Sequence, residues 1–433
     1  MYRFINFKSF ADATLDLDRS PVTILVGRNG AGKSNAFEAL AVLGGLAASI
    51  PVFEMVGKDG GRLGTVRGGL GWAVRAGQTE TTLAVSEAAG GNSLTYSVTV
   101  KVPKPDGAKS TPSIVAEELT ANGVRLLQAK QRGKGILRVK FEAEDNKVKQ
   151  INVGATATVL VDAAEGGTLP ASPRLRASAT AAMALAAVPL VLHPDPRAMR
   201  EYCQFGETQL APDASNLAAV LYALTRPKTG DPEAMNRITA ALRALPEEPF
   251  VAIKAIRTAM GDCTFGLADE RDRILWGARL LSDGTLRALA ILVALETTSP
   301  GAVLAIEEFD DAVHPARAAE LSAVIWECAE RRGLKVLVST HNVATLNALT
   351  AKQLRGVVLC WWDAKTAASQ LRHLTDLPSP EAFVSPGHLG DDVTAERYRA
   401  HLLPDAEFAA LREKAVAATF ARLRQLRTGQ EVG

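Results

Sequence analysis

The chain has 433 residues, enough for two or three average domains or for one elaborated domain. With 47% hydrophobic and 22% charged residues it has the composition of a globular protein with a sizeable core. Its formal net charge of +2 excludes a strong overall electrostatic field of either sign. The four cysteines are widely spaced and form no CxxC pair, so a disulfide framework and a zinc site are both disfavoured.

The longest apolar stretch covers residues 36–53 and contains Glu38 and the pair Gly44-Gly45. This pattern favours a core helix over a membrane span. Residues 1–4 lead directly into a strand pattern and do not resemble a signal peptide. We therefore expect a soluble cytoplasmic protein without a membrane-spanning segment.

In chain order, the first clear element is the continuous apolar run at 22–26, which predicts a strand buried on both faces of a parallel sheet. A glycine-rich turn and an Ala/Leu-rich helix from about Lys33 follow it. From about residue 66 to 162, apolar and polar residues alternate in runs that Gly-Gly and Asp/Asn breaks separate. This alternation indicates an antiparallel meander with one solvated face.

The pattern turns helical from about 173 to 260, with a helix start predicted at 213–216. After Leu280 the αβ pattern returns, with helices from about 285 and 315 and strands at 303–306 and 336–338, and residues 404–427 predict an amphipathic helix. The predicted parts are an N-terminal core segment, an antiparallel β-rich lobe, a helical insertion, a C-terminal core segment, and a final strand/loop with an amphipathic helix. They cover residues 1–65, 66–172, 173–270, 271–350 and 351–433, respectively.

The turn after the first buried strand has the GxxxxGK[ST] pattern of a Walker A loop, in the strand–loop–helix setting that this motif requires. Its glycines let backbone N–H groups close around phosphate oxygens, and the helix N-terminus adds a partial positive charge. Lys33 is expected to reach the β- and γ-phosphates, and the Ser34 hydroxyl to ligate Mg²⁺. The residues predicted to bind the nucleotide here are Gly27, Asn29, Gly30, Ala31, Gly32, Lys33, Ser34 and Asn35.

Two carboxylates, Glu307 and Glu308, follow the apolar run at 303–306. Alone, such a pair favours a solvated strand end, but downstream of a Walker A loop it predicts a Walker B strand. Glu307 is then expected to orient Mg²⁺ and its waters, and Glu308 to polarise the attacking water. His341 follows the strand at 336–338, where we interpret it as a switch histidine at the γ-phosphate and not as a structural residue.

The segment 281–285, Leu-Ser-Asp-Gly-Thr, opens the helix about 20 residues before the Walker B strand. As a local pattern, Ser-Asp-Gly is only a helix N-cap or turn signal. Its position in the order of motifs predicts an ABC signature loop, in which Ser282 and Gly284 bind the γ-phosphate held by an opposite subunit.

Taken together, these segments resemble the ordered motif set of the SMC/RecF/Rad50-like ATPases. Within that superfamily they are most similar to the compact AAA-15/AAA-21 group, which includes the ATPase parts of OLD-type and bacterial defence proteins. The resemblance covers the chain to about residue 350, and the middle β region and the last 80 residues match only loosely. The segments that carry it are 4–10 (FINFKSF), 27–35 (GRNGAGKSN), 281–292 (LSDGTLRALAIL), 306–315 (IEEFDDAVHP) and 338–342 (VSTHN).

The resemblance implies an α/β P-loop ABC-ATPase head with a mostly parallel core sheet, an antiparallel β lobe, and a helical insertion in place of long arms. It also implies ATP and Mg²⁺ as ligands, ATP hydrolysis, and a homodimer or higher even oligomer that sandwiches ATP. A separately encoded effector protein and DNA are the implied partners, with anti-phage defence or DNA repair as the setting.

The chain departs from the wider pattern in two places. Glu307 stands where most ABC proteins carry aspartate, and Phe309 replaces a common proline, so that 310–315 would form the D-loop. Gln78 is a candidate for the Q-loop glutamine, although a solvated turn is favoured. Four basic residues surround a predicted hairpin, where a solvated surface is favoured over contact with phosphate or a partner: Arg125, Lys130, Arg132 and Lys134.

Two other classes of protein remain open. A transporter nucleotide-binding subunit has a much shorter interval between the Walker A loop and the signature than this chain, so that class is disfavoured. The non-enzymatic alternative is an ATP-dependent scaffold that sequesters a toxin or effector with little turnover. The presence of both Glu308 and His341 favours hydrolysis over such a scaffold.

Overall fold

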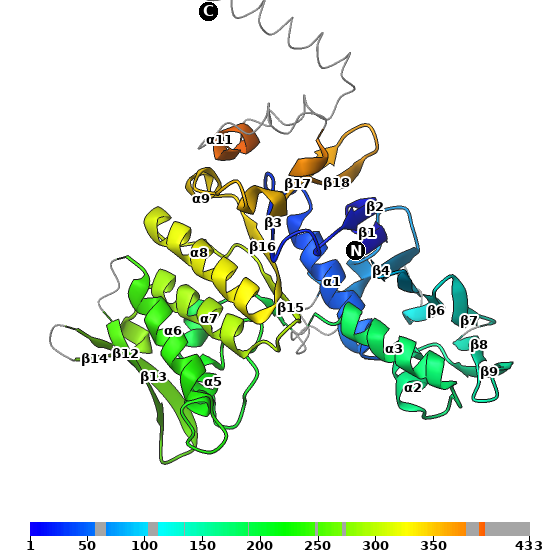
Figure 1. Cartoon of the computed structure of the whole chain (residues 1–433), viewed down its shortest axis with the longest axis horizontal. Helices are drawn as coiled ribbons and strands as arrows, with labels where there is room; N and C mark the ends of the chain where they lie inside the picture. The colour runs from blue at the N-terminus through cyan, green and yellow to red at the C-terminus, as the bar shows by residue number, and fades with distance from the viewer. Residues whose placement is uncertain are drawn as a thin grey trace, which may run out of the picture.

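The computed structural model describes residues 1–56, 66–102, 111–133, 135–188, 190–246, 250–270, 274–377 and 389–394. Its fold is mixed α/β and is organised on one 14-stranded sheet (Figure 1). The strand order across that sheet is β10-β15-β16-β3-β17-β18-β2-β1-β4-β5-β6-β7-β8-β9. Parallel strands therefore form one end of the sheet and antiparallel strands the other.

The parallel end holds five strands, and each pairs with its neighbour in the same direction. All residues of the second and fourth strands are buried, because helices or other strands cover both faces of the sheet. Ile24 and Leu25 belong to two different hydrophobic clusters, one on each face. The five strands are β10 (Leu190–Leu192), β15 (Val303–Ile306), β16 (Lys335–Thr340), β3 (Val22–Val26) and β17 (Val357–Asp363).

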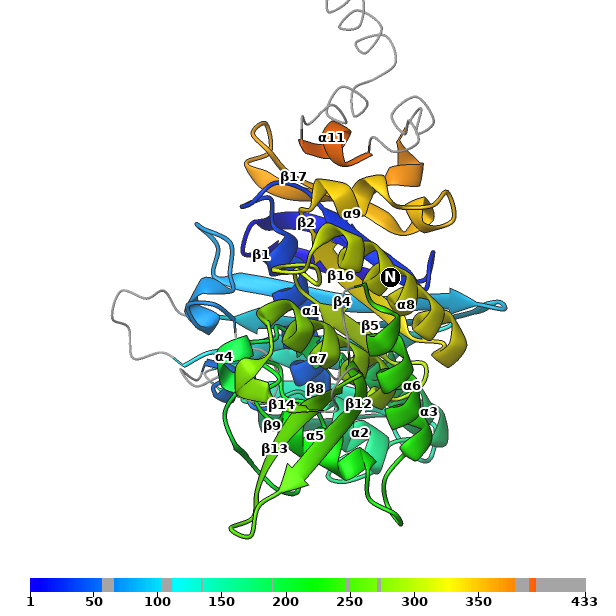
Figure 2. The same cartoon turned by 90° about the vertical axis from the view of Figure 1, so that its left-hand side faces the viewer.

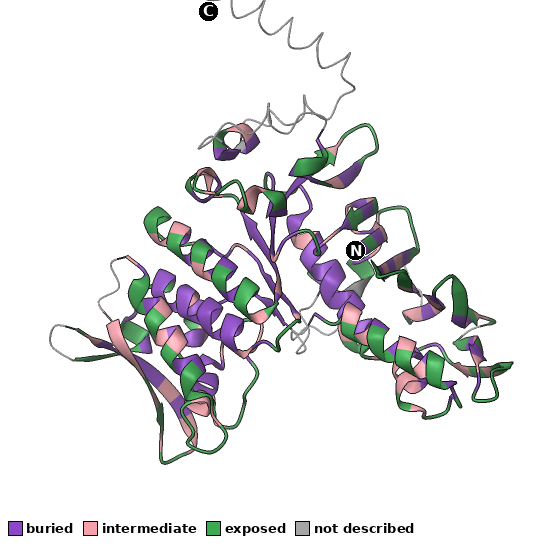
Figure 3. Cartoon of the chain, in the orientation of Figure 1, coloured by how far each residue is buried: buried purple, intermediate pink, exposed green. Residues whose placement is uncertain are grey.

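Helices from distant parts of the chain cover the two faces (Figures 1 and 3). On one face, residues of the parallel strands form a single hydrophobic cluster with α1 (Lys33–Ala47) and α3 (Pro173–Ala186). The inward-facing residues of the antiparallel strands belong to the same cluster. The other face packs against α7 (Asp283–Thr297) and α8 (Pro315–Arg332). The helix starts expected near 33, 285 and 315 and the strands expected at 22–26, 303–306 and 336–338 are confirmed.

The antiparallel end continues the same sheet. A hairpin joins β17 to β18, and β18 meets β2 in a single parallel pair. Antiparallel pairing then runs without a break to β9, so the β-rich lobe expected at 66–172 is joined to the core sheet edge to edge. The strands are β18 (Ala368–His373), β2 (Phe10–Leu15), β1 (Tyr2–Phe7), β4 (Glu80–Ala89), β5 (Asn92–Lys101), β6 (Ser113–Ala121), β7 (Val124–Gln131), β8 (Ile136–Glu142) and β9 (Val148–Gly154).

The interval 173–270, expected to be a helical insertion, contains a second sheet as well as helices. The prediction is wrong over β12 (Phe250–Arg257) and β13 (Asp262–Asp269), which pair antiparallel across a turn where Gly261 has φ +94°. This hairpin lies at the end of the molecule opposite α11 (Figure 2). The other elements of the interval are α4 (Pro196–Met199), β11 (Cys203–Gln204), α5 (Leu217–Leu224) and α6 (Pro232–Ala244), and β14 (Leu275–Gly277) follows it.

The remaining elements are short. They are α2 (Leu160–Glu165), α9 (Val343–Asn347), α11 (Leu389–Thr394) and the 3₁₀ turns η1 (Glu54–Val56), η2 (Leu70–Trp72), η3 (Ala278–Leu280), η4 (Gln353–Gly356) and η5 (Leu374–Asp376). The amphipathic helix predicted at 404–427 lies outside the described residues. Over the part of the chain that the structure covers, no helix has the length and apolarity needed to cross a bilayer.

Candidate nucleotide site

The loop between β3 and α1 has the backbone of a phosphate-binding turn. Gly30 and Gly32 adopt φ of +79° and +110°, a region that residues with a side chain rarely occupy. The Lys33 side chain lies back over this loop and donates from Nζ to the carbonyls of Gly27 (2.7 Å) and Arg28 (3.2 Å). Burial lowers the pKa of Lys33, while the nearby carboxylates of the site act in the opposite direction.

The hairpin β17–β18 supports this loop from behind. A Cβ placed on Gly27 would lie 2.0 Å from the Cys360 carbonyl oxygen, so no side chain fits there. The Cys360 thiol donates to the Ala31 carbonyl at 3.1 Å, and burial raises the pKa of that thiol to about 12. Asn35, predicted to bind nucleotide, donates from Nδ2 to the Ser9 hydroxyl at 2.6 Å.

The predicted Walker B residue Glu307 meets the Walker A loop directly. β15 lies in the same parallel sheet as β3, one strand away across β16, so residues that follow these strands share an edge. The Ser34 hydroxyl donates to Glu307 Oε1, and Glu307 is only 7% exposed. A hydroxyl and a carboxylate are the oxygen ligands that Mg²⁺ prefers beside phosphate oxygens and water. This pair therefore fits a magnesium ion.

Among the described residues, two further side chains contact Glu307, and the sequence motifs did not predict either. Arg67 Nη2 lies 2.8 Å and His193 Nδ1 3.0 Å from Glu307 Oε2. His193 directly follows β10, which pairs with β15 so that Leu192 lies opposite Ile306. Burial lowers the pKa of His193, and the Glu307 carboxylate partly offsets this effect. The apolar run that ends at Leu192 is the one local signal that could have indicated a strand end here.

Glu308 lies in a different environment from Glu307. Its φ of +49° is unusual for a residue with a side chain, and its N–H donates to the Ser339 hydroxyl at 2.9 Å. Its carboxylate Oε1 lies 3.9 Å from His341 Nδ1, beyond direct hydrogen bonding. These side chains are 45% and 51% exposed, so the two predicted catalytic residues are adjacent and open to solvent.

The residues of the predicted D-loop are tied to the segment that carries His341. Asp310 is buried and accepts hydrogen bonds from the hydroxyls of Thr340 (2.7 Å) and Thr345 (2.6 Å). Burial raises the pKa of Asp310, while these two hydrogen bonds lower it. Asp310 thus fixes the backbone around His341.

The predicted signature segment packs on the D-loop. Ser282 caps α7 by accepting from the Thr285 N–H at 3.1 Å, and its side chain is exposed. A Cβ on Gly284 would lie 2.8 Å from the Ala312 carbonyl oxygen, so the helix start and the D-loop touch backbone to backbone. Arg200 holds the segment by donating to the Leu281 carbonyl at 2.8 Å. These contacts involve α7 and the D-loop and not the phosphate loop.

The strand–loop–helix unit at 22–47 and the acidic end of β15 define the chain as a P-loop ATPase-type protein. Residues 22–347 match the family described as "AAA domain, putative AbiEii toxin, Type IV TA system", which is well over half of the chain. The chain therefore belongs to this AAA-21 family, and the resemblance to the AAA-21 group is confirmed. No curated protein matches it.

Several solved structures are similar to the chain. An SMC head bound to the C-winged helix domain of ScpA is 14% identical with a TM-score of 0.48, and covers 86% of this chain and 95% of its own. The SMC head domain from Thermotoga maritima is 14% identical with a TM-score of 0.38, and covers 86% and 97%. The Pyrococcus furiosus Smc head with an extended coiled coil, bound to the C-terminal domain of ScpA, is 12% identical with a TM-score of 0.46, and covers 86% and 94%.

Proposed function

We propose that the protein binds and hydrolyses ATP. The observation that carries this proposal is the meeting of three segments at neighbouring strand ends. Ser34 donates to Glu307, and Glu308 lies beside His341, so hydroxyl, carboxylates and imidazole surround the end of the phosphate loop. This is the set of groups that phosphoryl transfer to water requires, since it depends on positioning and charge stabilisation.

The surroundings of each side chain indicate its role in phosphate, Mg²⁺ or water binding. The Lys33 amine would leave the carbonyls it now contacts and place its charge on the β- and γ-phosphates. Ser34 and Glu307 would hold Mg²⁺, which supplies positive charge to the phosphate oxygens. Glu308, half exposed and without a hydrogen bond to His341, is suited to orient and polarise a water molecule. His341 is suited to contact the γ-phosphate.

Hydrolysis would require two copies of the chain. Ser282 is exposed and its hydroxyl caps α7, so the start of this helix can present backbone N–H groups to a phosphate held by a second copy. Arg287 on α7 pairs with Asp311 of the D-loop at 3.2 Å. The D-loop follows Glu308 directly, and its Asp310 holds the segment that carries His341. A homodimer that sandwiches two ATP molecules would thus couple nucleotide state to engagement.

Engagement of the heads would control DNA handling or a separately encoded effector in the cytoplasm. The family description names a toxin of a type IV toxin–antitoxin system, which supports an effector and a defence setting, with DNA repair as another. A second candidate is an ATP-dependent scaffold with little turnover. It is favoured by the contacts of Arg67 and His193 with Glu307, since Mg²⁺ would compete with these groups for the carboxylate.

Light scattering with and without ATP tests this function. The wild-type protein should associate when Mg²⁺-ATP is added, and Ser282→Arg should bind ATP but stay monomeric, because a long charged side chain would stand at the interface. Ser299→Arg, the same change at an exposed position just beyond the other end of α7, is the matched control and should behave as wild type. Normal association and turnover of Ser282→Arg would contradict the proposal.

A further inference from the structure

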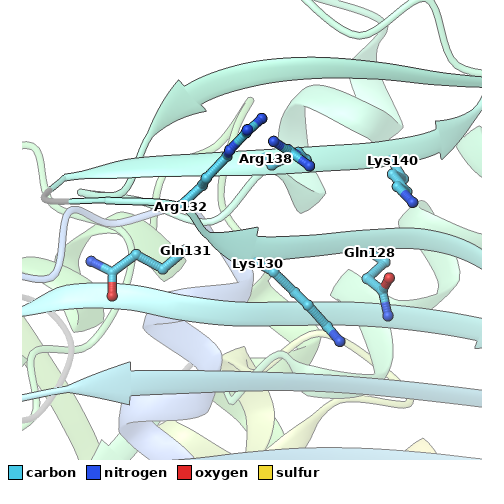
Figure 4. A pocket seen from close by; sticks show the side chains of 6 residues that line it. All are labelled: Gln128, Lys130, Gln131, Arg132, Arg138 and Lys140. Carbon is cyan, nitrogen blue, oxygen red and sulfur yellow. The ribbon is translucent and has the colours of Figure 1, made fainter.

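A group of cations lies on the outer face of the antiparallel end of the sheet, far from the nucleotide site in strand order. Lys130 on β7 is directly opposite Arg138 on β8, and Gln128 is opposite Lys140 (Figure 4). Arg132 follows β7, and its N–H donates to the Ile136 carbonyl at 2.9 Å. We call Lys130, Arg132, Arg138 and Lys140 the basic face. With Gln128 and Gln131 they line a shallow hollow of about 350 Å³.

The alternation of the strands fixes the basic face on the solvent side. The apolar residues that alternate with these positions on β7 and β8 point to the opposite face, where Leu127, Ala129, Leu137, Val139 and Phe141 are fully buried in the core. Because side chains alternate between the two faces, a register slip would bury the charges. The basic face is therefore held in place by the core beneath it.

No carboxylate in the described part of the chain neutralises the charges of the basic face. In the described residues, none of its four members forms an ion pair with a carboxylate, whereas neighbouring Arg125 and Lys149 pair with Glu118 (3.0 Å) and Asp145 (3.4 Å). Arg138 Nε is buried without a hydrogen-bond partner there. Like charges directly opposite on neighbouring strands are destabilising. The Lys130–Arg138 pair thus has a cost that binding of a polyanion would offset.

The dimensions of the basic face fit a nucleic-acid backbone. From residue 128 to 132, β7 and its extension span about 14 Å at roughly 3.4 Å per residue. Along the axis of a DNA duplex each strand carries one phosphate per about 3.4 Å, so a duplex lying along β7 presents about four phosphates of each strand over this length. Asn152 and Gln150 of β9 lie opposite Arg138 and Lys140 and add amide donors beside the cations.

We propose that the basic face binds the phosphate backbone of double-stranded DNA without reading its sequence. The outer positions of β7 and β8 carry no aromatic side chain on which single-stranded bases could stack. The proposal rests on the proposed function in one respect, namely that such a duplex would be the DNA handled by the ATP-driven heads. Binding to this face itself requires no nucleotide.

The test is fluorescence anisotropy of a labelled 20-base-pair duplex, without nucleotide, over a range of salt concentrations. The double variant Lys130→Gln/Lys140→Gln removes two exposed cations and leaves the core intact. Each lost phosphate contact should weaken binding about 8-fold at 0.1 M salt, so about 60-fold together, and the salt slope should fall by about 1.8. The charge-matched control Arg243→Gln/Lys352→Gln removes two cations that pair with Glu270 and Glu330, and should bind as wild type.

Equal affinity of the two double variants for the duplex would overturn the proposal. So would a wild-type protein that binds labelled poly-glutamate but not the duplex, because the partner would then be an acidic protein. ATP binding by the Lys130→Gln/Lys140→Gln variant should stay at the wild-type level. Because the duplex measurements contain no nucleotide, their failure would leave the ATPase proposal standing, and a failure of ATP hydrolysis would leave this one standing.

Discussion

Exchanging each of the two carboxylates after β15 for its amide should separate their roles. Glu307 is 7% exposed and contacts Ser34, Arg67 and His193. In Glu307→Gln one acceptor oxygen becomes an NH₂ group that faces donors, which removes a charged hydrogen bond worth about 1.5–3 kcal/mol. The Arg67 side chain is 65% exposed, so its screened ion pair adds less than about 1 kcal/mol. We expect a loss of about 2 kcal/mol in unfolding free energy.

The same substitution should weaken ATP binding only when Mg²⁺ is present, because an anionic magnesium ligand is lost. Glu308→Gln should leave both stability and Mg²⁺-ATP affinity near wild type, since the Glu308 side chain is half exposed. Its hydrolysis rate should fall by about 100- to 10,000-fold, the usual effect of losing a positioned base. ATP-bound engaged heads should then accumulate.

The assays are urea unfolding, calorimetric ATP affinity with and without Mg²⁺, and single-turnover hydrolysis. These assays compare the wild-type protein with the two isosteric variants, Glu307→Gln and Glu308→Gln. If Glu307→Gln traps ATP-bound dimers while Glu308→Gln turns over normally, the two roles are exchanged and the reasoning from burial is refuted.

Two further predictions concern buried positions. Gly27→Ala should abolish ATP binding and unfold at a much lower urea concentration, because its Cβ would lie 2.0 Å from the Cys360 carbonyl oxygen. Gly30→Ala has open space around its Cβ but a positive φ, so its unfolding free energy should fall by only about 1–3 kcal/mol. Equal melting of both variants would contradict this. Burial raises the pKa of Glu117 to about 7, so the folded state retains a proton that the unfolded state loses above about 4.5. Stability should therefore fall by about 3 kcal/mol as pH rises from 4.5 through 7, and urea melts at pH 5 and 8 should show that Glu117→Gln lacks this decline.

The parts predicted from the sequence are those whose physics is local. A phosphate loop is formed by consecutive residues, so the segment 27–34 can be recognised from the sequence without tertiary information. The strand before the loop and β15 are continuous apolar runs because both faces of the sheet are covered. The Ser-Asp-Gly pattern at 282–284 is a helix N-cap or turn signal, and Ser282 caps α7.

The parts not predicted depend on pairing between distant segments. His193 reaches Glu307 only because β10 pairs with β15, and nothing in the residues around it indicates that partner. Gly27 is constrained by Cys360 because β17 pairs with β3, and β17 lies outside the residues that match the family. The sequence predicts helix over the hairpin β12–β13, because small residues interrupt the alternation of its apolar residues, such as Ile253 and Phe265.

Subunit mixing tests the central claim, ATP hydrolysis by two engaged copies, most directly. Lys33→Ala should lack a functional phosphate loop, and Ser282→Arg should lack a functional signature, so neither variant alone should hydrolyse ATP. In an equal mixture, part of the wild-type rate should return, because only a mixed pair contains one complete site and carries the interface substitution on one copy alone. A mixture whose rate does not exceed the sum of the two separate variants would contradict the account.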